Sequence, residues 1–272
     1  MRKAGEILGS CVRGFLEKEV SKRAAMLTYY LVFAIFPFII AVISLLGFLK
    51  LPMLSLEGEA AAFLPADVIA LLNLTIAHMT ETSSGAVFTF GIVFSIWFPY
   101  RAVKNLTDEV SDIYGEEKPI GHTKRILLLS LLILILIPTM LILMIIGERV
   151  LSLVAQYFPI TVEFIAIWTK ARFLPMAIAL ILLISAIYYF SPNRPPAWQF
   201  ILPGAFLSTA LWMVYSIGFS YYVDHMGNYS VIYGSIGAII AFLIWINWSM
   251  TALLVGALFN QALREQYIEK GI

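Results

Sequence analysis

The sequence predicts an all-α polytopic membrane protein, a bundle of six transmembrane helices with interfacial amphipathic helices beside it. Six long apolar stretches support this fold class, and the loops between them carry alternately many and few basic residues. Apolar residues make up 61% of the chain and charged residues 13%, far from the composition of soluble domains. A helix of about 20 apolar residues crosses a hydrocarbon core roughly 30 Å thick. The stretches cover 27–49, 86–105, 126–147, 173–191, 200–223 and 235–259.

Six spans occupy so much of a 272-residue chain that no separate soluble domain is expected. We expect a cytoplasmic amphipathic helix in residues 1–26, the transmembrane domain in 27–260 and a cytoplasmic tail in 261–272. The first apolar stretch is too long for a signal peptide and has no small-residue cleavage site after it. It is therefore expected to stay as a membrane anchor.

The basic residues predict the orientation. Fourteen Lys and Arg residues lie in the N-terminal segment, the second and fourth loops and the C-terminus, against four in the other loops. The positive-inside rule then places both termini in the cytoplasm, which requires an even number of spans.

Three segments outside the spans have apolar stripes typical of helices at the membrane surface. The stripe within residues 5–20 consists of Ile7, Leu8, Cys11, Val12, Phe15, Leu16 and Val20, with Lys and Glu opposite. Its basic residues would suit anionic lipid headgroups. A second stripe lies in residues 68–79, and residues 150–168 form an apolar segment interrupted by Pro159, interfacial or re-entrant. The alternative is that these helices only cap the bundle.

Four prolines lie inside or near the ends of predicted spans and are candidate helix breaks: Pro37, Pro99, Pro138 and Pro203. Each removes one helical hydrogen bond, which a neighbouring group or water must replace. Transporters build midplane sites from interrupted helices, whereas purely structural membrane helices also contain proline.

Six residues in or at the edge of the bilayer are candidates for contact with a substrate or a lipid: Arg101, Lys104, Asn247, Asp224, His225 and Tyr233. Arg101 and Lys104 follow the second span, so they either extend to the interface or, with Lys22 and Arg23, bind an anionic headgroup. Asn247 either joins two helices by a hydrogen bond or contacts the substrate. The pair 224–225 marks an outer vestibule or a solvated turn.

Several short motifs follow one another in a recognisable order. They are Leu27-Thr28-Tyr29-Tyr30, Ile35-Phe36-Pro37, the run from Tyr100 to Tyr114-Gly115, Pro192-Asn193-Arg194, Leu202-Pro203-Gly204-Ala205, Tyr229, Tyr233-Gly234-Ser235, Trp245, Gly256-Ala257 and Asn260. Together their order and spacing resemble the YihY/BrkB membrane family, formerly named ribonuclease BN, over nearly the whole chain. The resemblance implies a multi-pass protein of the bacterial inner membrane.

The chain departs from the family pattern at three places. Ala34 stands where a serine is usual, Val110-Ser111 where Leu-Asn is usual, and Leu258 where an acidic residue is usual. A carboxylate inside a membrane is a natural proton or cation site. Any ion coupling that depends on the acidic position therefore does not carry over to this chain.

The older family name raises the possibility of a nuclease, which the sequence does not favour. The three histidines are His78, His122 and His225, and the predicted topology puts His122 on the opposite side from the other two. No zinc-ligand spacing is present, Cys11 is the only cysteine, and a net charge of +1 gives no footprint for nucleic acid. We expect no enzyme activity, no metal and no cofactor.

Two functions remain. One is a transporter or flippase-like protein for a lipid or another amphiphile; the alternative is a non-transporting factor that binds lipid or organises an envelope assembly. The expected partners are membrane lipids and a second copy of the chain or envelope proteins, with no nucleic acid. The interiors of the six spans contain no Asp, Glu or His, so transport is expected to be independent of a proton bound inside the bundle.

Overall fold

The structure, a computed structural model, describes residues 2–48, 85–116, 123–133, 135–136, 173–225 and 235–269. The labelled helices are α1 (Arg2–Glu17), α2 (Val20–Phe48), α4 (Gly85–Ile113), α7 (Phe173–Phe190), α8 (Trp198–His225) and α10 (Ser235–Glu269). Residues 123–133 are helical as well. The all-α fold class is therefore confirmed for the described part of the chain.

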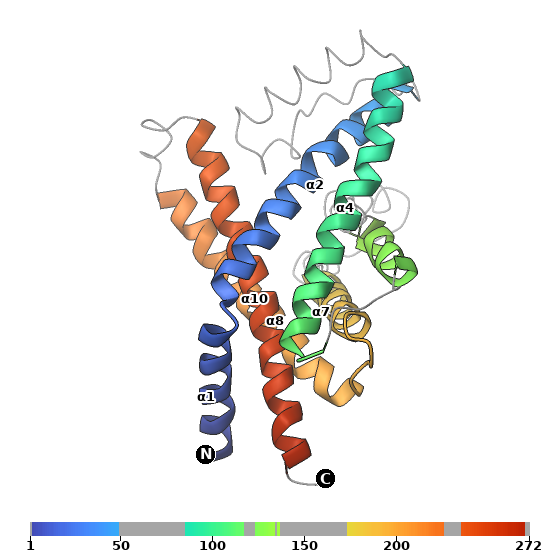
Figure 1. Cartoon of the computed structure of the whole chain (residues 1–272). Coiled ribbons are helices and arrows are strands. Elements are labelled where there is room, and N and C mark those ends of the chain that lie inside the picture. Colours follow the sequence, from blue (N-terminus) through green and yellow to red (C-terminus); the bar gives the residue numbers. More distant parts are fainter. Residues whose placement is uncertain are drawn as a thin grey trace, which may run out of the picture.

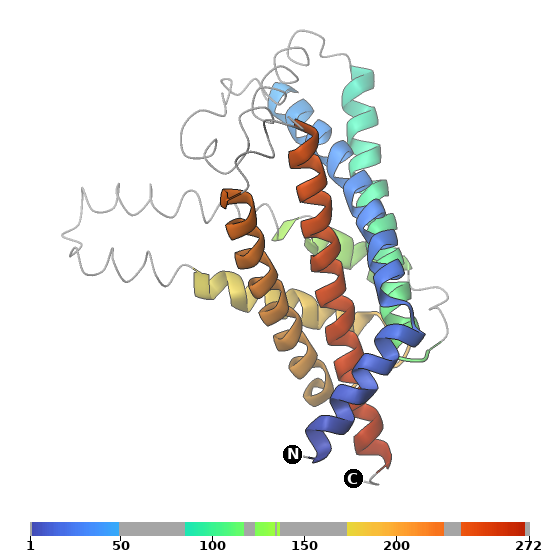
Figure 2. The ribbon, with the colours of Figure 1, turned by 90° about the vertical axis from the view of Figure 1, so that its left-hand side faces the viewer.

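The four longest helices, α2, α4, α8 and α10, run alternately in opposite directions (Figure 1). Figures 1 and 2 show the start of α1 and the end of α10 at the same end of the molecule, as an even number of spans requires. We call this end the terminal end and the opposite end the distal end.

The long helices form two pairs. One pair is α2 packed along α4, and the other is α8 packed along α10, with α10 also contacting α2. In Figure 1 the two pairs lie together near the terminal end and diverge toward the distal end.

The shorter helix α7 does not share this direction. Figure 2 shows it lying across the long helices, and it contacts α8 and the end of α4. Pro192, Pro195 and Pro196 end α7 and reverse the chain into α8, since proline restricts the residue before it to extended conformations.

The prediction of six spans is confirmed only in its coarser form, an all-helical chain with long apolar helices. In the described part, two segments are long and apolar enough to cross a membrane, Trp198–Tyr222 and Ile239–Tyr267. The predicted span 173–191 corresponds to α7, which lies crosswise. The predicted span 126–147 is described only to residue 136, and the stripes at 68–79 and 150–168, with Pro138 and Tyr233, lie outside the described residues.

Helix α1 confirms the helix predicted over 5–20, although it ends at Glu17. Glu19 adopts φ of 49°, in the left-handed region that interrupts a right-handed helix, and α2 then begins at Val20. The predicted stripe is divided between two environments. Ile7, Cys11 and Phe15 are half-buried, while Leu8, Val12 and Leu16 are exposed.

Three of the four candidate helix-break prolines lie inside described helices without ending them. Pro99 is inside α4 and Pro203 inside α8, and both helices continue beyond them. Helix α2 likewise runs through Pro37.

The hydrophobic core lies at the terminal end. It brings together the first turns of α2, the last turns of α4, the second half of α7, the start of α8 and the second half of α10. Its members include Val20, Ala24, Leu27, Val110, Ile113, Ile184, Ile187, Ile201, Leu254, Ala257 and Leu258. The two helix pairs are therefore held together by apolar packing at this end.

Candidate functional site

The closest approach of two helices lies where α8 crosses α10 at the terminal end. A Cβ atom added to Gly256 would overlap Ser208 Oγ and stand 2.5 Å from the Gly204 carbonyl oxygen. A Cβ atom added to Gly204 would overlap the Gly256 carbonyl oxygen and the side chain of Asn260. Only glycine fits at either position, as in other membrane helices that cross through small residues.

Tyr188 of α7 and Ser208 of α8 bind the backbone of α10 beside Gly256. The Tyr188 hydroxyl lies 2.7 Å from Ser208 Oγ and 2.5 Å from the Leu253 carbonyl oxygen, to which it donates. Ser208 Oγ donates to the Ala252 carbonyl oxygen at 3.0 Å. Because Gly256 has no side chain, both hydroxyls reach carbonyls that lie one turn earlier in α10.

Asn260, one turn after Gly256, binds α8 on both sides of Pro203. Its Oδ1 accepts from the Gly204 backbone N–H at 2.7 Å, and its Nδ2 donates to the Ile201 carbonyl oxygen at 3.1 Å. The same Nδ2 lies 3.2 Å from the hydroxyl oxygen of Tyr114, directly after α4. One fully buried amide thus joins the ends of α4, α8 and α10.

Burial raises the pKa of the Tyr114 hydroxyl well above its ordinary value, and the Asn260 hydrogen bond and the charge of Arg264 only partly oppose this. The phenol is therefore neutral at physiological pH, and its oxygen accepts from the Asn260 amide.

The turn after α4 is also joined to the turn after α7. Ser111 Oγ donates to the Ser191 carbonyl oxygen at 2.6 Å, and Glu116 Oε2 accepts from the Asn193 backbone N–H at 2.7 Å. The crosswise helix α7 is thus fixed to both helix pairs, by Tyr188 to α10 and by these bonds to α4.

We call this set of residues the polar crossing: Tyr114, Tyr188, Gly204, Ser208, Gly256 and Asn260. Its side chains are neutral, so the arrangement is suited to holding helices together rather than to transferring protons or binding a cation. No group of three His, Cys, Asp or Glu residues in the described ranges is placed to hold a metal ion.

Beyond the polar crossing, aromatic side chains join the two members of each helix pair. In the first pair, Phe33 of α2 lies against Phe98 of α4, with ring centroids 6.5 Å apart, and Tyr29 packs on Phe33 within α2 at 4.5 Å. In the second pair, Trp212 lies 6.1 Å from Trp245, and Tyr215 lies 5.8 Å from Trp248. Trp245 also donates its indole N–H to Ser216 Oγ at 3.2 Å.

The predicted site residues do not gather in one place. Arg101 is exposed on α4 and Lys104 is partly exposed one turn later. Asn247 is half-buried on α10, outside the polar crossing, and within the described chain its side chain makes no hydrogen bond to another helix. Asp224 and His225 are the last residues of α8, at the distal end. The predicted roles of these residues stay predictions.

Two basic residues that the sequence groups with Arg101 are bound to acidic side chains. Arg23 forms ion pairs with Glu109 and, at 2.6 Å, with Asp112. Lys22, which is largely exposed, pairs with Glu19. Arg23 is therefore engaged within the protein, between α2 and α4.

The sequence motifs include Gly204, Gly256 and Asn260, whereas none of them contains Tyr188 or Ser208. The available signal was the four-residue spacing of Gly204 and Ser208 on one helix and of Ala252, Gly256 and Asn260 on the other. Such spacing marks a face where helices approach closely, although it does not name the partner helix.

Long apolar helices, crossed through glycine and joined by buried neutral hydrogen bonds, are features of helical membrane proteins. A family described as virulence factor BrkB matches residues 11–271, and the chain belongs to this family. The resemblance found in the sequence motifs is confirmed.

Curated relatives support the same assignment. A Bacillus subtilis (strain 168) protein named "Putative ribonuclease-like protein YfkH" is 27% identical over 254 residues, covering 91% of each chain. A protein of Tolumonas auensis named "UPF0761 membrane protein" is 37% identical over 84 residues, which are 31% of this chain and 28% of the relative. A "UPF0761 membrane protein" of Pseudoalteromonas translucida is 30% identical over 98 residues, 36% of this chain and 32% of its own. No solved structure matches the chain.

Proposed function

We propose that this BrkB-family membrane protein moves a lipid or another amphiphile across the bilayer, and that the structure represents a state closed at the terminal end. The observation that carries the proposal is the difference between the two ends of the helix pairs. The pairs are joined by the core and by Asn260 at the terminal end, and they diverge toward the distal end (Figure 1).

The surface of the distal halves supports an amphiphilic substrate. Large apolar side chains stay exposed there on both pairs, including Trp97 of α4, Val214 and Ile217 of α8, and Ile239 of α10. The candidate spans Trp198–Tyr222 and Ile239–Tyr267 contain no Asp, Glu, Lys or Arg before Arg264. Such surfaces favour hydrocarbon over a hydrated ion.

An arrangement closed at one end and divergent at the other is what alternating access requires of two helix pairs that move as units. The aromatic contacts within each pair support movement of the pairs as units. Each pair keeps its own packing in the region where the two pairs diverge (Figure 1). By the distribution of basic residues, the closed end faces the cytoplasm.

Lipid movement in vesicles tests the proposal. Purified full-length protein in proteoliposomes that contain a trace of fluorescent phosphatidylethanolamine should make inner-leaflet lipid accessible to an external quencher, in proportion to the amount of protein. An imposed proton gradient should leave the rate unchanged, because the predicted spans contain no Asp, Glu or His. Vesicles that behave like protein-free vesicles with every headgroup tested would refute transport of lipid.

The alternative of a non-transporting lipid-binding factor is favoured by one observation, the exposed apolar half of α1. Mass spectrometry of lipid retained in mild detergent separates the two proposals when combined with the vesicle assay. Retained lipid without lipid movement supports the binding factor.

A further inference from the structure

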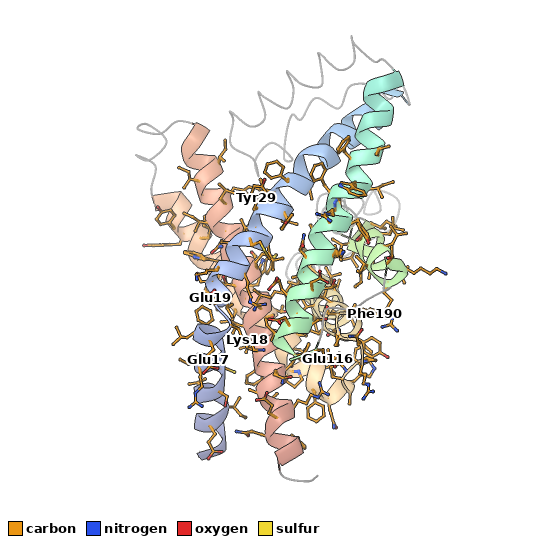
Figure 3. The ribbon with its side chains drawn as sticks, in the orientation of Figure 1. Glu17, Lys18, Glu19, Tyr29, Glu116 and Phe190 are labelled. Carbon is orange, nitrogen blue, oxygen red and sulfur yellow. The ribbon has the colours of Figure 1, made fainter. Side chains whose placement is uncertain are left out.

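The turn between α1 and α2 is fastened to the end of α4. Lys18 Nζ donates to the carbonyl oxygens of Asp112 and Ile113, at 2.9 and 3.0 Å. The last carbonyls of a helix lack intrahelical partners and carry the negative end of its dipole, so an ammonium group satisfies both needs. Figure 3 shows Lys18 beside the terminal end of α4, near Glu116.

Arg23 reinforces the same attachment. Its Nε donates to the Lys18 carbonyl oxygen at 2.6 Å, while its other nitrogens bind the carboxylates of Glu109 and Asp112. The side chains of Arg23 and Glu109 are only 25% and 13% exposed, so solvent screens this ion pair less than a surface pair. The turn is therefore held in place from two directions.

Besides its attachment to α4, the N-terminal helix α1 contacts α10, a member of the other helix pair. Helix α1 packs against α10, and a Cβ atom added to Gly14 would stand 3.0 Å from Leu258 Cδ2. The same addition at Gly5 or Gly9, on the exposed side of α1, would meet no atom within 4 Å. Helix α1 thus bridges the two helix pairs, through Lys18 to α4 and through Gly14 to α10.

We propose that α1 is a latch that keeps the two helix pairs closed at the terminal end and that it separates from α10 when this end opens. The inference rests on the proposed function, because it names what regulates opening of the same closed end. Lys18 and Arg23 keep α1 attached to the first pair, so the contact at Gly14 is the one that separates.

Cys11 offers a direct readout of this separation, since it is the only cysteine in the chain. It is half-buried on α1, one turn before Gly14 and Phe15 and on the same face. Burial also raises the pKa of its thiol, which lowers the fraction of reactive thiolate near neutral pH while α1 is docked. Separation from α10 both exposes the thiol and returns its pKa toward the ordinary value, so labelling becomes faster.

The first experiment measures the rate of Cys11 labelling by a water-soluble maleimide, with the full-length protein in nanodiscs of phosphatidylethanolamine and phosphatidylglycerol. Gly14→Leu should raise the labelling rate about fivefold. This corresponds to a docking free energy weakened by about 1 kcal/mol, because about 1.4 kcal/mol changes an equilibrium tenfold. Gly9→Leu makes the same chemical change on the open side of α1 and should leave the rate unchanged. Arg23→Gln should raise the rate less than Gly14→Leu, and Lys22→Gln, which removes an exposed charge, should not raise it.

The second experiment tests whether separation opens the terminal end, and it does not depend on transport. Spin labels at Ala25→Cys on α2 and Glu265→Cys on α10, both exposed, are introduced with Cys11→Ser. With Gly14→Leu added, pulsed electron resonance should show a second population at longer distance, absent with Gly9→Leu.

Equal labelling rates in Gly14→Leu and Gly9→Leu would overturn the docking of α1 described here. Faster labelling of a folded Gly14→Leu protein with an unchanged distance distribution would overturn the latch. Failure of lipid movement in vesicles would refute the transport proposal alone, because neither of these measurements uses a substrate.

Discussion

The terminal and distal halves of the bundle are held together in different ways. At the terminal end, α8 and α10 cross through glycine, buried hydroxyls of α7 and α8 bind α10, and the Asn260 amide also reaches Tyr114, directly after α4 of the other pair. Beyond this crossing, aromatic rings join the members within each pair, Phe33 to Phe98 in one and Tyr215 to Trp248 in the other. Aromatic contacts tolerate small shifts, whereas a glycine crossing with hydrogen-bonded carbonyls has one geometry.

This difference indicates where the molecule is rigid and where it has freedom. In a membrane, apolar contact between helices gains little over contact with lipid, so close approach and interhelical hydrogen bonds decide which helices stay together. The terminal end has both, and substitutions there should therefore cost much more stability than matched substitutions in the distal half.

The largest effect is expected at the glycine crossing. Gly256→Ala places a methyl group against the Gly204 carbonyl oxygen and the Tyr188 hydroxyl, 2.5 and 2.6 Å away, and a backbone oxygen cannot move aside cheaply. We expect a loss of about 3 kcal/mol or more in the free energy of unfolding, the upper range of overpacking. Size-exclusion chromatography after heating in detergent measures the shift.

The matched substitution in the distal half is Gly218→Ala, on the same helix as Gly204 and with open space around the added atom. Alanine favours a helix over glycine by up to about 1 kcal/mol, so this protein should be unchanged or slightly more stable. Equal losses at both glycines would contradict the distinction between the two halves.

The next effect is expected from Asn260→Ala. It removes the partner of the Gly204 N–H and of the Ile201 carbonyl beside Pro203, which should cost about 2 kcal/mol in unfolding free energy. Asn247→Ala removes the same amide from the half-buried part of α10 and should cost about 0.5 kcal/mol or less. Unfolding of both variants by urea or by denaturing detergent measures the two losses in unfolding free energy. A loss for Asn247→Ala equal to or larger than that for Asn260→Ala would contradict the prediction.

A smaller effect is expected from the Tyr188 hydroxyl. Tyr188→Phe keeps the ring but removes the hydrogen bond to the Leu253 carbonyl, at a cost of about 1 kcal/mol in unfolding free energy. Tyr215→Phe is the control, because its ring contact with Trp248 survives the substitution. A thermal midpoint lowered as much by the control as by Tyr188→Phe would mean that the hydroxyl does not hold α7 to α10.

The smallest effect is a dependence of stability on alkaline pH. Folding raises the pKa of Tyr114, so the folded state keeps a proton that the unfolded state loses above about pH 10. Stability should be independent of this group below that pH and should fall as pH rises above it. Tyr114→Phe should show a weaker fall in thermal midpoint between neutral and strongly alkaline solution, and an identical fall in both proteins would exclude this origin.

Much of the architecture follows from the sequence, because hydropathy and helix periodicity are local properties. They predict long helices such as α2, α8 and α10 and the amphipathic N-terminal helix α1. With the distribution of basic residues they also predict two termini at one end, where the start of α1 and the end of α10 lie (Figure 1). They do not predict that α7 lies across the bundle, since an apolar run of 18 residues suits either a span or a buried crosswise helix. The direction of α7 depends on partners such as Leu253, which is 65 residues from Tyr188 in the chain.

The candidate site was less predictable than the fold for the same reason. Gly256 and Asn260 stand out as a small and a polar residue in an apolar span. The partners of Asn260, however, lie far away along the chain: Gly204 is 56 residues away and Tyr114 is 146 residues away. The sequence allows Arg23 to help bind an anionic headgroup, because it does not reveal that the acidic partner Glu109, 86 residues away, lies beside it. Charge counts in one segment do not reveal such pairings.

The position of α1 has a consequence for biosynthesis. It leaves the ribosome before the other described helices, whereas the carbonyls that Lys18 binds follow 94 and 95 residues later and Leu258 follows later still. At about 5–20 residues per second, α1 waits roughly ten seconds or more for α10. Throughout that interval the half-buried face of α1 lacks its partner α10, and the bilayer surface is the nearest apolar phase. Docking of α1 against α10 is therefore among the last steps of assembly, and we expect a chain stopped before Leu258 to keep its N-terminal helix undocked, at the bilayer surface.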